Sequence, residues 1–163
     1  MKMLITAVVV LLLSACSSEF DKVSAKAEQG HAKAQFNLGV AYDDGKIVAR
    51  DYKEAVKWYT KAAEQGYASA QYRLGYMYFG SRGVARDSKE AVKWYTKAAE
   101  QGYARAISML GFMYENGKGV AQNYKEALMW YTKGAEQGPA SAQFSLGVAY
   151  DDGKIVARDY KEA

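Results

Sequence analysis

Apolar and polar residues alternate with a helical period over most of this chain after its first sixteen positions. Between Ala32 and Asp43, an apolar residue recurs every fourth position, which predicts one face of an α-helix. That stripe consists of Ala34, Leu38 and Tyr42. After a turn, a second stripe predicts a second helix, and it consists of Ala55, Trp58, Tyr59 and Ala62.

This two-helix pattern recurs every 36 residues. The segment WYTKA or WYTKG begins at Trp58, Trp94 and Trp130. The 17-residue segment GVAYDDGKIVARDYKEA occurs at residues 39–55 and again, unchanged, at 147–163. The units are residues 27–62, 63–98, 99–134 and an incomplete 135–163. Such self-similarity indicates gene growth by duplication, and it predicts an all-α stack of repeated units.

Each predicted second helix starts with a residue that suits an N-cap. The cap residues are Asp51, Asp87, Asn123 and Asp159, and each has a glutamate three positions later. This is the spacing of a capping box. The predicted units end at a glycine, as helix C-termini commonly do.

A glycine lies inside every predicted first helix, as Gly39 does in the first copy. Glycine costs about 1 kcal/mol relative to alanine at such a position. Because it recurs in all four copies, we expect a neighbouring helix to approach it closely. We interpret the recurring tryptophans, which begin the WYTK segments, as core residues.

These motifs closely resemble the Sel-one-like repeat family, a 36-residue relative of tetratricopeptide repeats. The resemblance rests on the LG…Y pattern of the first helix, on YENGKGV at Tyr114–Val120 and on DYKEAVKWYTKAAEQG at Asp51–Gly66. It implies a right-handed α-solenoid with roles in complex assembly, signalling or host-cell interaction. Ile47 and Ile155 depart from the pattern by replacing a turn glycine, and in copy two the first turn glycine comes one place early.

The N-terminus has the features of a secretory signal peptide over residues 1–15. Lys2 precedes an apolar run from Leu4 to Leu13, which is too short to span a bilayer. The run closes with Leu-Ser-Ala-Cys, which resembles the lipobox of bacterial lipoproteins. The resemblance implies cleavage before Cys16, lipidation of that cysteine and attachment to the cell envelope. Since serine follows the cysteine, an outer-membrane anchor facing the periplasm is expected.

Residues 16–26 are expected to hold the lipidated cysteine, a short tether and a partial capping helix. Cys16 is the only cysteine, so no internal disulfide is possible. The chain has 22 Lys and Arg against 18 Asp and Glu, a net charge of +4, with the two signs interspersed. This pattern does not indicate nucleic-acid binding, which needs clustered basic residues.

No catalytic or metal-binding constellation is evident, and no cofactor is expected. His31 is the only histidine and does not recur between copies, which favours a surface position. The Asp43-Asp44-Gly45 turn resembles a fragment of a calcium loop but lacks the alternating ligands, so we interpret it as solvated. Cysteine-rich relatives of the family are associated with β-lactam hydrolysis or binding, but they carry paired cysteines that this chain lacks.

The candidate binding residues are those on the first-helix side opposite the apolar stripe, because they vary between copies. First helices line the concave groove of repeat solenoids. The candidates are Asn37, Val40, Arg73, Tyr76, Met109, Phe112, Ser145 and Val148. The alternative is that Tyr76 and Phe112 pack against the neighbouring repeat.

The function hypothesis is a non-enzymatic envelope lipoprotein that binds a protein or peptide partner. The alternatives are a cell-wall or β-lactam hydrolase and a truncated gene fragment. The fragment hypothesis arises because copy four ends at Ala163, before its second-helix tryptophan.

Overall fold

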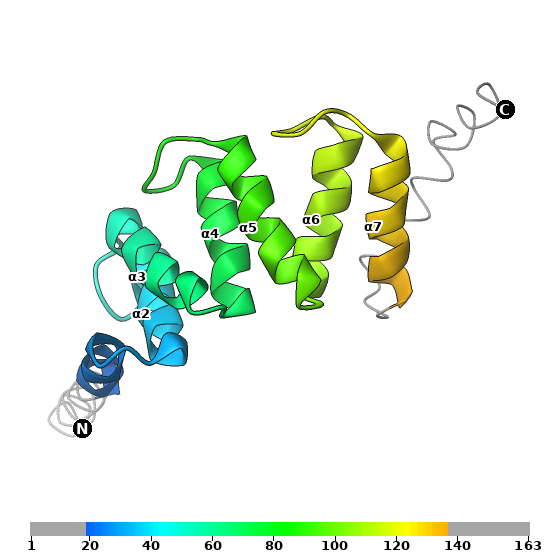
Figure 1. Cartoon of the computed structure of the whole chain (residues 1–163). Helices are drawn as coiled ribbons and strands as arrows, with labels where there is room; N and C mark the ends of the chain where they lie inside the picture. The colour runs from blue at the N-terminus through cyan, green and yellow to red at the C-terminus, as the bar shows by residue number, and fades with distance from the viewer. Residues whose placement is uncertain (1–18, 137–163) are drawn as a thin grey trace, which may run out of the picture.

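The structure is a computed structural model that describes residues 19–136. Three helix pairs fill most of this range (Figure 1). The pairs are α2 (Ala32–Asp44) with α3 (Tyr52–Glu64), α4 (Ala68–Gly80) with α5 (Ser88–Glu100), and α6 (Ala104–Glu115) with α7 (Tyr124–Glu136). Residues 19–28 form a further helix before α2. The predictions for Cys16, Ser145, Val148 and the fourth unit lie outside the described residues.

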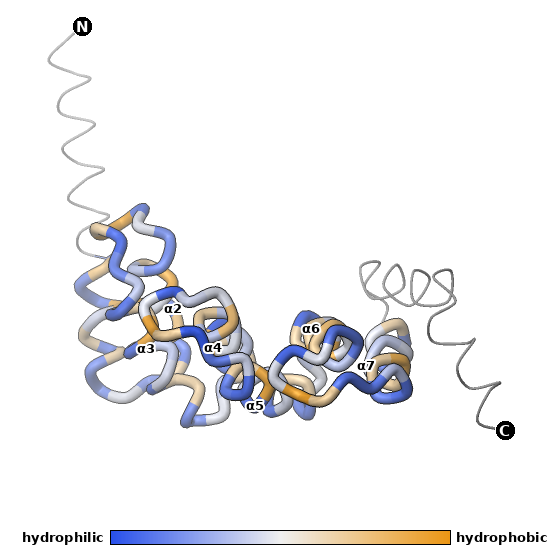
Figure 2. Tube along the Cα trace, turned by 90° about the horizontal axis from the view of Figure 1, so that it is seen from above, coloured by the Kyte–Doolittle hydropathy of each residue, from blue (hydrophilic) through white to orange (hydrophobic). Residues whose placement is uncertain are grey.

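Each helix from α3 to α6 packs against the helix before it and the helix after it, so the pairs stack in chain order. Figure 1 shows this order from α2 and α3 through to α6 and α7. Seen from above, hydrophobic and hydrophilic segments alternate along each helix (Figure 2). Between residues 19 and 136 no β-strand occurs. The predicted all-α solenoid of helix pairs is confirmed.

The core is built from the predicted stripes. Ala55, Tyr59 and Ala62 of α3 are fully buried, and their counterparts in α5 are buried equally. Trp58 and Trp94 are only 7% and 8% exposed, which confirms them as core residues, whereas Trp130 is half-buried at the edge of the apolar cluster around Tyr95. In each repeat a lysine three positions later lies over the tryptophan ring, at 4.2 Å from the centroid for Lys61 on Trp58 and 4.5 Å for Lys97 on Trp94.

The recurring glycine of the first helix receives a tyrosine ring from the second helix of the same repeat. A Cβ atom on Gly39 would lie 2.6 Å from Cδ1 of Tyr59, and one on Gly75 would lie 2.8 Å from Cδ1 of Tyr95. Gly111 and Tyr131 make the same contact. The predicted close approach is confirmed, and the buried ring offsets the conformational cost of the glycine.

The predicted N-caps are confirmed within the described range. The Asp51 carboxylate accepts hydrogen bonds from the backbone N–H groups of Lys53 and Glu54 at 2.9 and 3.1 Å. Asp87 caps α5 in the same way, and Asn123 Oδ1 accepts from the backbone N–H of Glu126 at the start of α7. The N–H of each cap residue donates to a carbonyl in the first helix of its own repeat, as Asp51 does to Tyr42. The glutamates of the capping-box spacing are therefore free to form other contacts.

Two buried glutamines connect consecutive repeats. The Gln35 side chain donates to the carbonyl of Ala27 and accepts from the Gln65 side chain at 2.6 Å. Gln71 repeats this arrangement 36 residues later, with Ala63 and Gln101. Each glutamine adds a second donor to a carbonyl at the C-terminal end of the preceding helix, which also accepts from the N–H of the glycine three positions later.

The helix over residues 19–28 packs against the first repeat through apolar side chains. Phe20, Val23 and Ala27 join a cluster that also contains Leu38 and Trp58. This contact covers the apolar side of α2 at the N-terminal end of the stack.

Candidate interaction surface

The candidate residues of the first helices differ in how far they are exposed. Asn37 is exposed on α2 and Phe112 is 37% exposed on α6. The other four described candidates, Val40, Arg73, Tyr76 and Met109, are half-buried. The structure places all six on α2, α4 and α6, as predicted, but gives some of them contacts within the solenoid.

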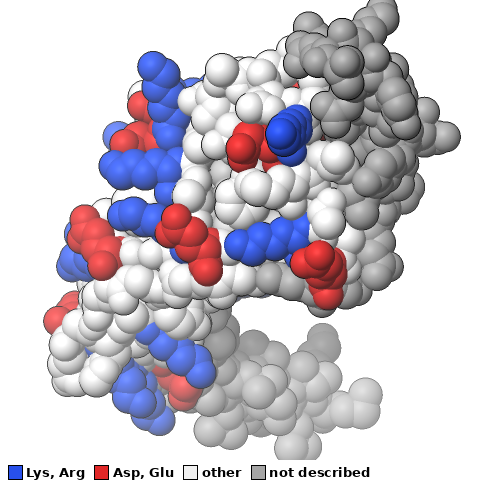
Figure 3. All heavy atoms as spheres, turned by 45° about the vertical axis from the view of Figure 1, so that its right-hand side comes forward, with Lys and Arg blue, Asp and Glu red and all other residues white. Residues whose placement is uncertain are grey.

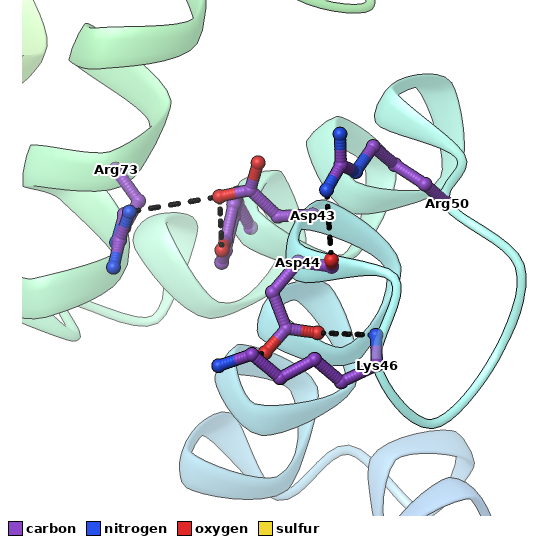
Figure 4. Close-up of polar contacts among 6 residues, drawn as sticks. Asp43, Asp44, Lys46, Arg50 and Arg73 are labelled. Carbon is purple, nitrogen blue, oxygen red and sulfur yellow. Dashed lines mark hydrogen bonds and ion pairs between the residues drawn. The ribbon is translucent and has the colours of Figure 1, made fainter.

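Arg73 forms an ion pair with the preceding repeat. Its Nη1 lies 3.6 Å from Oδ2 of Asp43, and the same Oδ2 accepts a hydrogen bond of 3.2 Å from the Tyr59 hydroxyl (Figure 4). The Asp43 side chain is only 11% exposed. The prediction that the Asp43 turn is solvated is therefore wrong for this residue, because Tyr59 and Arg73 enclose its carboxylate. Asp44 beside it does point to the turn, where it accepts from the N–H of Lys46.

The next repeat has apolar residues where the first two have this ion pair. Phe79 occupies the position of Asp43, and Met109 occupies the position of Arg73. Both pack against the apolar cluster around Tyr95. Arg73 and Met109 thus help to join repeats, which leaves less of their side chains for a partner.

The tyrosines that pack on the first-helix glycines are buried in all three repeats, but their hydroxyl groups have different surroundings. Burial, followed by the Asp43 charge, raises the pKa of Tyr59 above its usual range. Burial and the hydrogen bond to Glu115 raise the pKa of Tyr131. Burial also raises the pKa of Tyr95, whose hydroxyl has no hydrogen-bond partner within the described range. The reason is that Phe79 occupies the position at which the other two repeats have a carboxylate, Asp43 or Glu115.

Tyr76 and Phe112 are the aromatic residues of the candidate surface. The Arg82 guanidinium lies 5.0 Å from the Tyr76 ring centroid. Phe112 meets Phe79 edge-to-face, with centroids 6.1 Å apart. The alternative that Phe112 packs against the neighbouring first helix therefore holds in part, since Phe79 belongs to α4. Phe112 is nevertheless 37% exposed.

The sequence interpretation missed the arginines in the loops beside this surface. Arg82 lies over Tyr52 of the preceding repeat as well as over Tyr76. Arg50 lies over the same Tyr52 ring, and its Nη2 donates to the carbonyl of Asp44 at 3.0 Å (Figure 4). A sequence signal was available for two of them, because an arginine stands one position before the N-cap residue in three copies, as Arg50, Arg86 and Arg158.

Charges of both signs lie side by side on the face shown in Figure 3. Ion pairs of this kind join Lys57 to Glu54 and Lys93 to Glu90, each at 3.0 Å. In residues 19–136, no group of three or more His, Cys, Asp or Glu side chains is placed to hold a metal ion. His31 is exposed at the start of α2 and makes no capping hydrogen bond.

None of the helices in the described range has the length and apolar character needed to cross a membrane.

Comparison with known families matches the Sel1 repeat to four segments of the chain, residues 32–67, 68–103, 104–139 and 140–163. Comparison with curated proteins gave no match.

Two solved structures share 43% sequence identity with the chain. One is c5321, a protective antigen of uropathogenic Escherichia coli with an SLR fold, at a TM-score of 0.79 over 82% of this chain. The other is a Sel1 repeat protein from Oxalobacter formigenes, at 0.77 over 80%. The chain spans 29% and 54% of the lengths of these two proteins. Cysteine-rich protein B of Helicobacter pylori, at 20% identity, covers 80% of this chain and 93% of its own with a TM-score of 0.62, and shares the fold.

Proposed function

Because the chain belongs to the Sel1 repeat family, we propose that it is a lipid-anchored protein of the bacterial cell envelope whose repeats dock a protein partner. It acts by binding, without turnover. Sel1 repeats support a role as a scaffold for protein–protein interaction. The binding surface is the side of α2, α4 and α6 that faces away from their apolar stripes.

The observation that carries this proposal is the aromatic character of the first-helix surface in the middle of the stack. Phe112 is 37% exposed, and Tyr76 is half-buried under an arginine. Aromatic residues and arginine are enriched in the cores of protein interfaces. The core positions of the second helices recur from copy to copy, whereas these surface positions vary, as expected where a scaffold is constant and its recognition surface is specific.

The anchor in this proposal is Cys16. Its support is the order of a positive start, an apolar run and small residues before the cysteine. Each buried methylene of an acyl chain contributes about 0.8 kcal/mol, so two or more chains hold a soluble domain at a membrane. The proposed location is the periplasmic face of the outer membrane.

A crosslinking pull-down from envelope extract tests the docking surface, with the full-length chain in detergent as bait. A Tyr76→Ala/Phe112→Ala variant should lose the captured partner. The matched control is Ile47→Ala/Met129→Ala, which removes two other exposed apolar side chains and should retain it. Capture of the same partner by all three baits would place the surface elsewhere, and no capture by the wild-type bait would argue against a scaffold.

Metabolic labelling tests the anchor. Cells that express the wild-type chain should incorporate a palmitate analogue into it, and cells that express Cys16→Ser should not. Equal labelling of both chains, or a wild-type chain recovered unlabelled in the soluble fraction, would contradict a lipid anchor at Cys16.

A further inference from the structure

Three exposed arginines lie in the loops that join the first and second helices of repeats one and two. They are Arg50, Arg82 and Arg86, and together they are named the arginine rim. Arg82 and Arg86 lie beside the first-helix surface, because their aromatic neighbours Tyr76 and Phe79 belong to α4. Arg50 is linked to Arg82 through Tyr52 of α3, which both contact.

Aromatic rings hold each guanidinium group of the rim. Arg82 lies 5.0 Å from the Tyr76 centroid and 5.8 Å from that of Tyr52, and Arg50 also lies 5.8 Å from the Tyr52 centroid. Arg86 lies 5.5 Å from the Phe79 centroid. Stacking of this kind orders a long side chain before a ligand arrives, which lowers the entropy lost on binding.

The loop that carries Arg82 is also fixed by its backbone. A Cβ atom on Gly83 would overlap the backbone carbonyl of Tyr52, so this loop lies directly on the start of α3. The two rings beside Arg82, Tyr52 and Tyr76, belong to consecutive repeats. The contact at Gly83 therefore fixes the position of the Arg82 loop relative to Tyr52.

No arginine of the rim has a carboxylate partner in residues 19–136. The nearby carboxylates already have other partners. Asp43 binds Arg73 and Tyr59, Asp44 binds Lys46, Asp51 and Asp87 cap helices, and Glu115 accepts from Tyr131. The rim thus presents three cations whose N–H donors are not used by acidic side chains of the described chain.

We infer that the arginine rim binds an acidic segment of the protein partner, a run of Asp and Glu side chains. This inference rests on the proposed function and deepens it. The planar guanidinium group pairs with carboxylates through two parallel N–H···O bonds while its face stays on an aromatic ring. The acidic segment runs along the rim, and the apolar part of the partner contacts Tyr76 and Phe112.

Fluorescence anisotropy with the full-length chain in detergent and a labelled oligoglutamate peptide tests the inference. The Arg50→Gln/Arg82→Gln/Arg86→Gln variant should bind the peptide about tenfold more weakly than wild type, or worse. The matched control is Lys61→Gln/Lys97→Gln/Lys133→Gln, which removes three charges that also lie on aromatic rings. It should bind within about twofold of wild type. Circular dichroism checks that each variant is folded. If the triple arginine variant does not fold, the single Arg82→Lys variant takes its place in the binding measurement.

Three results would overturn the inference. The first is equal weakening in the arginine and lysine variants, which would show general charge attraction. The second is equal affinity for oligoglutamate and oligoglutamine. The third is stronger binding to vesicles of anionic lipid than to the peptide, lost in the same arginine variant, which would assign the rim to a membrane surface.

The same variants in the pull-down separate this inference from the proposed function. If wild type and the arginine variant capture a partner equally, the arginine rim is not part of the interface, and the proposed scaffold function still stands. A wild-type bait that captures nothing while it still binds oligoglutamate would count against the scaffold alone.

Discussion

At the scale of single residues, one tyrosine position shows how the repeats have diverged. Tyr59 and Tyr131 donate their hydroxyls to Asp43 and Glu115, at 3.2 and 2.8 Å. Tyr95 is fully buried and has no such partner within the described range. A buried hydroxyl without a hydrogen bond costs about 1–3 kcal/mol, whereas a hydrogen bond to a charged group contributes about 1.5–3 kcal/mol.

Removing these hydroxyls should therefore have opposite effects. Tyr95→Phe should raise the free energy of unfolding by about 1 kcal/mol, since it removes an unsatisfied polar atom. Tyr59→Phe should lower it by about 2 kcal/mol, because Asp43 loses a donor. Urea unfolding followed by circular dichroism measures both. A loss of stability in Tyr95→Phe would mean that its hydroxyl has a partner.

The same tyrosines predict how stability depends on alkaline pH. The pKa values of Tyr59, Tyr95 and Tyr131 are raised by burial above the ordinary value of about 10. The unfolded chain then loses these protons first. Titration of these phenols therefore leaves stability unchanged below about pH 10 and lowers it as the pH rises from there toward their raised pKa values.

Urea titrations from neutral to alkaline pH check this dependence. Stability should fall above about pH 10, and the fall should be shallower in Tyr95→Phe, which has one fewer titrating phenol. If the free energy of unfolding falls equally steeply with pH in wild type and in Tyr95→Phe, Tyr95 contributes nothing to the pH dependence.

At the scale of elements, the turn after each first helix needs a left-handed residue. Gly45 and Gly117 occupy it with φ values of 68° and 61°, but in the second repeat Ser81 does so at 55°. The glycine of that turn lies one position earlier, at Gly80, inside the last turn of α4. Left-handed backbone costs a residue other than glycine about 1–2 kcal/mol.

Ser81→Gly should therefore raise the free energy of unfolding by about 1 kcal/mol. Ser108→Gly is the matched control, because Ser108 lies within the helix α6, where glycine should lower stability by about 0.5 kcal/mol. Thermal or urea unfolding gives both values. The same sign for both substitutions would contradict a strained turn at Ser81.

At the scale of the whole molecule, the helix pairs described between residues 32 and 136 pack mainly against their neighbours in the chain. The loop glycines Gly83 and Gly119 are part of this coupling, since a Cβ on either would overlap a backbone carbonyl of the preceding repeat. Ile47 holds the corresponding position of the first repeat and is 53% exposed. This explains why the turn glycine of the pattern is needed in the inner repeats and is replaced in the first.

Gly83→Ala should lower the free energy of unfolding by more than its backbone strain alone, because it also weakens the contact between repeats one and two. Gly66→Ala is the matched control, because Gly66 also has a positive φ, of 86°, but no neighbouring atom within 4 Å of a Cβ. The control should cost about 1–2 kcal/mol and leave unfolding cooperative. Gly83→Ala should cost more and broaden the unfolding transition, as expected of a solenoid with one weakened interface. Equal costs and equal transition widths would show that the loop adapts.

The helices, their N-caps and the 36-residue stack could be predicted from the sequence, because these features depend on local signals that recur. The stripe around Leu38, the caps from Asp51 onward and the glycine at Gly39 can each be interpreted within one repeat. Even the tyrosine packed on Gly39 comes from the same repeat.

Which residues of the first-helix surface are exposed could not be predicted from the sequence, because it depends on packing between repeats. Whether Arg73 faces a partner or pairs with Asp43 depends on the angle between consecutive repeats, which no local pattern encodes. The same angle brings Arg82 over Tyr52, thirty positions earlier in the chain, and creates the arginine rim. Residues at equivalent positions of the repeats thus differ in role. Packing between repeats buries some of them in contacts within the solenoid and leaves others exposed.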